Sequence, residues 1–119
     1  MFRVLLILIL LSASVFAQTQ EKLKTYKFFE YEKISNNLLK EKLENFRLEV
    51  MKSKNSQGQI INYGKPSEVA KAEKQLKKNM FNCGYAGCYW LTFINGGVSK
   101  KGKTELWIVP EGAEPPMPN

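Results

Sequence analysis

The spacing of hydrophobic residues predicts two amphipathic helices in the middle of the chain. The first is expected to begin at Asn36-Asn37, which offers a cap, and to end before Asn55. Its apolar positions recur at intervals of four, three and four residues: Leu39, Leu43, Phe46 and Val50. A second helix is expected from Pro66-Ser67 to about residue 82, with apolar positions at Val69, Ala72, Leu76 and Met80.

Four short runs rich in aromatic and β-branched residues predict strands, at residues 25–31, 59–63, 88–94 and 104–109. The run 88–94 is apolar on both faces, which predicts a central strand. The order strand, helix, strand, helix, strand, strand predicts an α/β two-layer sandwich. In it, two helices pack on a mixed four-stranded sheet, and a hairpin closes the chain.

The first residues have the pattern of a secretory signal peptide. Arg3 precedes an apolar run over residues 4–11, and Val15 and Ala17 provide the small side chains that favour cleavage before Gln18. The apolar stretch is shorter than the roughly 20 residues that span a bilayer. We therefore expect a signal peptide at 1–17, one domain at 18–110 and a proline-rich flexible tail at 111–119. The mature chain is expected to be exported to the periplasm or the cell exterior, with no transmembrane segment.

The amino-acid composition limits which catalytic and metal-binding side chains this expected domain can have. Of 18 basic residues, Arg3 lies in the signal peptide, which leaves 17 against 11 acidic residues and a net charge of +6. Every acidic residue is a glutamate, and the sequence contains no histidine and no aspartate. A Ser-His-Asp or Cys-His catalytic pair and a histidine metal ligand are therefore excluded. We expect a protein that is not an enzyme and that has neither a cofactor nor a metal site.

Cys83 and Cys88 are the two cysteines of the chain. An even number in an exported protein favours a disulfide bridge between the second helix and the third strand. Two free thiols and a redox pair are the alternatives. A redox pair usually has two intervening residues and a helix N-terminus beside its first cysteine.

Lysines supply nearly all the positive charge. Six of them form two groups, on the second helix and before the last strand: Lys71, Lys74, Lys78, Lys100, Lys101 and Lys103. One interpretation is a solvated polar face, and the other is contact with a cell-wall or other anionic envelope polymer. Nucleic acid is not expected as a partner, because the mature chain has one arginine and no base-stacking motif. Aromatic residues of the strands fit a core better than a sugar-binding face.

Three segments resemble a group of small exported bacterial proteins: residues 34–46, 58–64 and 105–116. More distantly, residues 28–109 resemble the C-terminal domain of outer membrane protein A. That resemblance implies the OmpA-like fold and a non-covalent hold on the stem peptide of peptidoglycan. The family holds it with an aspartate after the second strand and an arginine on the second helix. The corresponding positions here are the turn at Lys65 and Gln75, so both anchoring groups are missing.

These features together predict an exported, non-catalytic envelope binding or interaction protein with a degenerate OmpA-like fold. Its partner would be the cell wall, an anionic envelope polymer or an envelope protein. One alternative is a peptidoglycan-associated protein that keeps weak wall binding through other residues. Another is a small secreted hydrolase or inhibitor, which a substrate-sized cleft with converging glutamates would favour.

Overall fold

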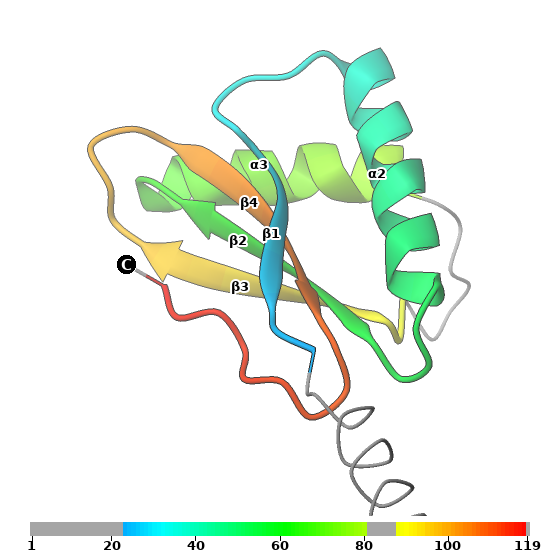
Figure 1. The fold of residues 1–119 in the computed structure, drawn as a ribbon. Coiled ribbons are helices and arrows are strands. Elements are labelled where there is room, and N and C mark those ends of the chain that lie inside the picture. Colours follow the sequence, from blue (N-terminus) through cyan, green and yellow to red (C-terminus); the bar gives the residue numbers. More distant parts are fainter. Residues whose placement is uncertain (1–22, 81–87, 119) are drawn as a thin grey trace, which may run out of the picture.

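The computed structural model describes residues 23–80 and 88–118, and it has the expected order of elements. Two helices pack on a mixed four-stranded sheet, so the two-layer α/β arrangement is confirmed (Figure 1). The elements are β1 (Tyr26–Tyr31), α2 (Asn36–Met51), β2 (Gln57–Tyr63), α3 (Pro66–Asn79), β3 (Leu91–Gly97) and β4 (Lys103–Val109).

The order of strands across the sheet is β1-β4-β2-β3. β4 is antiparallel to both of its neighbours, whereas β2 and β3 are parallel and are joined through α3. Two sequence expectations are therefore wrong. β3 is an edge strand, not a central one, and the last two strands form no hairpin because β4 inserts between β1 and β2.

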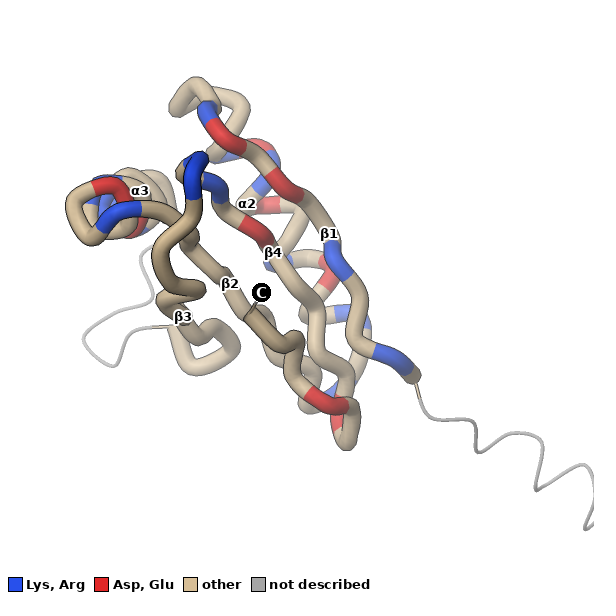
Figure 2. The backbone as a smooth tube through the Cα atoms, turned by 90° about the vertical axis from the view of Figure 1, so that its left-hand side faces the viewer, with Lys and Arg blue, Asp and Glu red and all other residues tan. Residues whose placement is uncertain are grey.

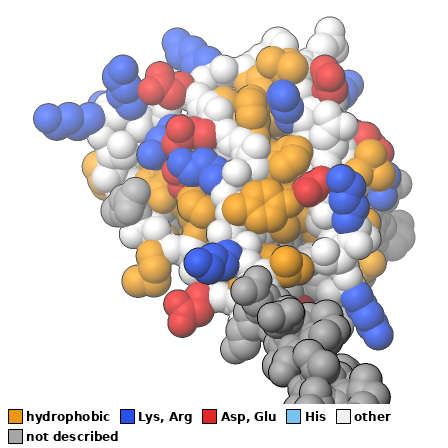
Figure 3. Space-filling view, in the orientation of Figure 1, with side chains coloured by type: hydrophobic (Ala, Val, Ile, Leu, Met, Phe, Trp, Pro, Cys, Tyr) orange, Lys and Arg blue, Asp and Glu red, His pale blue; other side chains and the backbone are white. Residues whose placement is uncertain are grey.

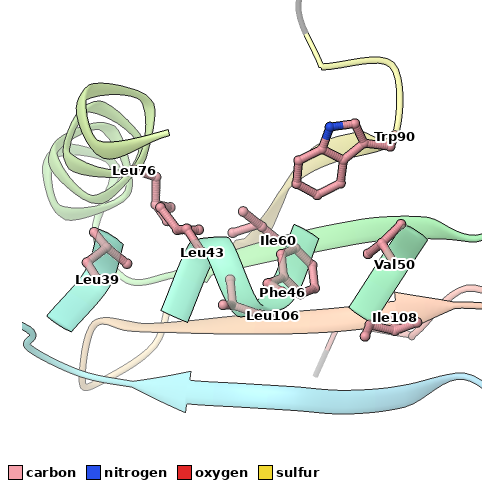
Figure 4. Packing of buried hydrophobic residues seen from close by; sticks show 9 residues of the cluster. All are labelled: Leu39, Leu43, Phe46, Val50, Ile60, Leu76, Trp90, Leu106 and Ile108. Atoms are coloured by element: carbon pink, nitrogen blue, oxygen red, sulfur yellow. The ribbon is translucent and has the colours of Figure 1, made fainter. Parts of the chain in front are cut away.

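The two helices bury their apolar stripes against one face of the sheet (Figure 4). All four apolar positions expected on α2 are at most 2% exposed, as is Leu76 of α3. They pack with Ile60 of β2 and with Leu106 and Ile108 of β4. The N-cap of α2 is Ser35, not Asn36, because the Ser35 hydroxyl accepts a hydrogen bond from the Leu38 N–H at 3.3 Å.

The expected strand 88–94 is also displaced along the chain, because β3 begins at Leu91 and residues 88–90 lie before it. Trp90, just before β3, is 5% exposed, and its ring makes an edge contact with the Phe46 ring at a centroid distance of 5.9 Å. In β1, a register irregularity between Lys27 and Phe29 accommodates Phe28. Consecutive phenylalanines, Phe28 and Phe29, can then both pack against the core. Apolar residues on both faces of a run therefore do not require a central position.

The segment after β4 has no helix or strand over residues 110–118. Two hydrogen bonds join it to the rest of the domain. The Thr25 hydroxyl donates to the Glu114 carbonyl at 2.5 Å, and the Asn55 amide donates to Glu111 at 3.2 Å. Within residues 23–80 and 88–118, no helix is long and apolar enough to cross a membrane.

Candidate functional site

A pocket of about 710 Å³ opens at the edge of the sheet where β1 and β2 end and β4 begins. Three separate stretches of chain supply most of its walls: the β1–α2 connection, α3 and the β3–β4 connection. Five lysines and two glutamates line it, so the lining carries a net positive charge. Figure 2 shows basic positions of the β3–β4 connection and the start of β4 at the same end of the molecule as the start of α3.

The lysines at the rim are exposed and carry unbalanced charge. Among the described residues, no ion pair involves the four that form it: Lys33, Lys71, Lys100 and Lys101. The space-filling view shows basic side chains projecting beyond the body of the molecule at the side where the β3–β4 connection lies (Figure 3). Unpaired cations around a concavity attract an anionic group.

The fifth lysine, Lys103, is partly buried and is paired with two glutamates. Its ammonium lies 3.4 Å from Glu30 and 3.6 Å from Glu105, and 5.0 Å from the centroid of the Tyr63 ring. Partial burial lowers the pKa of Lys103, but contacts with Glu30 and Glu105 outweigh it and the pKa is raised. Lys103 is therefore charged at neutral pH, and its charge is already balanced within the protein.

Neutral hydrogen-bonding groups form the floor. Burial raises the pKa of Tyr31 to about 12, and among the described residues its buried hydroxyl has no hydrogen-bond partner. The Tyr31 phenol therefore keeps its proton at neutral pH. Beside it, the Thr104 hydroxyl donates to the Asn62 side-chain oxygen at 2.6 Å. Uncharged side chains therefore lie beneath the cationic rim.

Two glycines allow the walls of the pocket to approach each other. Gly64, at the end of β2, has φ +139°, a conformation that side-chain-bearing residues rarely adopt. A Cβ atom on Gly64 would lie 3.2 Å from Cα of Gly102, and one on Gly102 would lie 2.9 Å from Oε2 of Glu68. The other oxygen of Glu68 accepts the Lys65 N–H at 3.1 Å and caps α3. The Glu68 carboxylate thus has a structural role at the base of this wall.

The structure separates the two positions at which the OmpA-like resemblance places ligand anchors. Gln75 lines the pocket, whereas Lys65 is exposed and does not line it. The Gln75 amide donates to the Ile34 carbonyl at 3.1 Å and to the Asn36 side-chain oxygen at 3.2 Å. Gln75 therefore ties α3 to the β1–α2 connection.

Four of the six lysines expected to contact an anionic polymer meet in this pocket, namely Lys71, Lys100, Lys101 and Lys103. Lys74 and Lys78 are exposed on α3 but do not line it. Sequence reasoning missed Lys33 and Glu32, which directly follow β1. Their position directly after β1 could have indicated them. β1 and β2 run in the same direction, and strands that do so end at the same edge of the sheet.

The remaining expected features lie elsewhere. Cys83 falls outside the described residues, and Cys88 packs against the core before β3, so the disulfide stays a prediction. The aromatic residues form no single face. Phe28, Phe29 and Phe93 pack on the core, while Tyr89 is 82% exposed. Within the described part of the chain, no group of three or more acidic or cysteine side chains could hold a metal ion.

Comparison of the chain with protein-family models, with curated proteins and with solved structures finds no match. The chemistry of the lysine-lined pocket is therefore the basis for a functional conclusion.

Proposed function

We propose that the mature chain is an exported, non-catalytic module that binds an anionic ligand of the cell envelope in the lysine-lined pocket. The observation that carries the proposal is the convergence of four unpaired lysines, from three separate segments, around one concavity. Lysine is a point-charge donor suited to phosphate and carboxylate oxygens.

A hydrolase is the less favoured reading of the same pocket. Glu32 and Glu68 both line the cleft, as a pair of catalytic carboxylates would. Glu68, however, accepts the Lys65 N–H and lies under Gly102, so its position is explained by the turn. No pocket-lining residue in the described chain is a serine, cysteine or histidine that could act as nucleophile or imidazole base. These contacts of Glu68 support the binding proposal over hydrolysis.

Chemical-shift mapping tests the proposal. The ¹⁵N-labelled mature chain would be titrated with sodium tripolyphosphate and, separately, with citrate. We expect the amide shifts to be concentrated at the residues that line the pocket, namely 31–34, 63, 68, 71, 72, 75 and 100–104. The variant Lys71→Gln/Lys101→Gln should bind about tenfold more weakly, because each exposed ionic contact contributes up to roughly 1 kcal/mol.

The matched control is Lys24→Gln/Lys54→Gln. It removes the same charge from exposed residues that precede β1 and β2, at the opposite end of those strands. This control should bind like the unmodified chain. Shifts spread evenly over all lysines, or an equal loss in both variants, would contradict a specific site.

Weak peptidoglycan association is a second candidate, favoured by the place of Gln75 in the pocket. Rim lysines could contact wall carboxylates, but such contacts are screened by salt. We expect binding to purified sacculi at low salt that disappears at physiological salt. Salt-resistant co-sedimentation that free stem peptide competes away would instead support the inherited function. A pull-down of the mature chain on isolated cell walls, compared with whole envelope extract, would then identify the ligand.

A further inference from the structure

A row of exposed lysines runs along α3 from the pocket. Lys71, Lys74 and Lys78, here called the α3 row, are all exposed. Residues three and four apart lie on one side of a helix, so these positions form a continuous stripe about 10 Å long. Lys71 also lines the pocket, and Lys78 lies one turn beyond Gln75, which lines it too. The row therefore begins inside the site and leads out of it.

The remaining lysine of α3, Lys77, differs from the α3 row because its charge is paired. Lys77 pairs with Glu73 at 2.8 Å, and its ammonium lies 5.3 Å from the centroid of the Phe93 ring. The two glutamates of α3 are thus both occupied, Glu73 by Lys77 and Glu68 by the Lys65 N–H. Among the described residues, no ion pair includes a member of the α3 row.

Such a row has a cost for the free protein. Like charges three and four residues apart on a helix repel each other and destabilise it. The helix dipole favours a cation in the last turn, which accounts for Lys77 and Lys78. It does not account for Lys71 and Lys74, which lie earlier in α3. An extended anionic ligand that continues out of the pocket would neutralise all three.

We propose that the ligand is a polyanion, a chain of repeated phosphate or carboxylate groups. One anionic group occupies the pocket and the following groups lie along the α3 row. This inference rests on the proposed pocket function and specifies its ligand class. It predicts that affinity increases with chain length and that Lys74 and Lys78, which lie outside the pocket, cause the increase.

The experiment measures affinity for polyphosphates of increasing length, from tripolyphosphate to long chains, at equal concentrations of phosphate groups. The unmodified chain should bind long polyphosphate at least about tenfold more tightly than tripolyphosphate. Lys74→Gln/Lys78→Gln should bind tripolyphosphate normally and lose most of this gain. Lys24→Gln/Lys54→Gln, with the same net charge, should keep the gain.

The dependence on salt gives a second readout. Each lysine–phosphate contact releases counterions, so the slope of log K against log salt counts contacts. For long polyphosphate, the magnitude of this negative slope should fall by roughly 1 to 2 in Lys74→Gln/Lys78→Gln. It should remain unchanged in Lys24→Gln/Lys54→Gln. Parallel titrations with poly-glutamate distinguish a carboxylate polymer from a phosphate polymer. Vesicles with anionic lipid test a membrane surface.

The outcomes separate this inference from the function on which it rests. If tripolyphosphate binds in the pocket but chain length or the row variant has no effect, the polyanion inference is wrong and the pocket function stands. If neither short nor long polyanions of either kind bind, both are wrong. Binding to anionic vesicles without binding to soluble polyanions would overturn the inference in favour of a membrane surface.

Discussion

The side-chain ammonium of Lys27 lies 3.1 Å from a carboxylate oxygen of Glu105, which joins the edge strand β1 to the central strand β4. Glu105 is 3% exposed, and it also accepts a hydrogen bond from the Trp107 indole at 3.2 Å. Burial alone would raise the pKa of Glu105. Hydrogen bonds from Trp107, Lys27 and Tyr63 together outweigh this effect and lower the pKa below its ordinary value of 4.5.

The lowered pKa of Glu105 predicts a loss of stability in acid. Its contribution is fully present above the unfolded pKa near 4.5 and decreases as pH falls through the lower, folded value. Glu105→Gln should lower the free energy of unfolding at neutral pH by about 1–3 kcal/mol, and it should flatten the acid-side pH dependence. Urea unfolding across the acid range measures both, with the exposed Glu41→Gln as control. Equal pH profiles for Glu105→Gln and the unmodified chain would contradict this role.

Gly64→Ala should destabilise the domain by about 1–3 kcal/mol, because alanine is strained at φ +139° and its Cβ would approach the backbone of Gly102. Gly102→Ala is the matched comparison. The close approach of its Cβ would be to the end of the flexible Glu68 side chain, at 2.9 Å, and the Tyr63 carbonyl oxygen lies at an ordinary 3.6 Å, so the cost should stay below about 1 kcal/mol. Thermal or urea unfolding of both variants tests which substitution costs more stability. A larger loss of stability for Gly102→Ala than for Gly64→Ala would contradict this account of the turn.

Gln75→Ala should reduce stability more than binding. The Gln75 amide donates one hydrogen bond to Ile34 in the β1–α2 connection and one to Asn36 at the start of α2, and their loss should cost about 1–2 kcal/mol. Affinity for tripolyphosphate should change by no more than about twofold, since Gln75 carries no charge for the anion. Urea unfolding and titration on the same sample separate the two effects. Unchanged stability with abolished binding would identify Gln75 as a ligand contact.

The predicted bridge between Cys83 and Cys88 closes a loop of six residues. The chain-entropy estimate for such a loop is a stabilisation of about 2 kcal/mol. Thiol alkylation of the mature protein without reductant should label neither cysteine, and Cys83→Ser/Cys88→Ser should unfold at a lower urea concentration. Full labelling of both cysteines before reduction would exclude the bridge.

Export predicts that protein recovered from its native host begins at Gln18, because Val15 and Ala17 fit the cleavage pattern of a signal peptide. Intact mass spectrometry of the recovered protein measures this directly. A variant with Ala17→Arg should accumulate as the uncleaved chain, since a large charged residue is not accepted next to the cut. If the unmodified protein is recovered with residues 1–17 still attached, export by this route is contradicted.

The helices and their buried faces could be predicted from local pattern. Leu39, Leu43, Phe46 and Val50 were expected on one face of α2, and all are buried. Helix periodicity reports burial directly, because the same side of the cylinder recurs every three to four residues. The expected cap of α2 was Asn36, one residue after the observed cap, Ser35. Serine and asparagine are both good caps, but it is the Ser35 hydroxyl that accepts the Leu38 N–H.

The sheet order and the site could not be predicted in this way. An apolar run over residues 88–94 suggested a central strand, but strand order depends on which distant segments pair. β4 pairs with both β1 and β2, and the preceding strand β3 is left at the edge. The pocket depends on the same pairing, because the parallel direction of β1 and β2 brings Lys33 to the same edge as Lys71 and Lys101.

The sequence by itself determined the kind and order of the elements, the buried helix faces, the basic charge and the absence of histidine and aspartate, because these depend on residue type and local spacing. Only the tertiary structure decided that lysines from the β1–α2 connection, α3 and the β3–β4 connection surround one cavity. It also decided which lysines are neutralised, since Lys103 meets Glu30 and Glu105 while Lys71 meets neither. Charge balance depends on distances between residues far apart in the chain, and those distances are set by strand order.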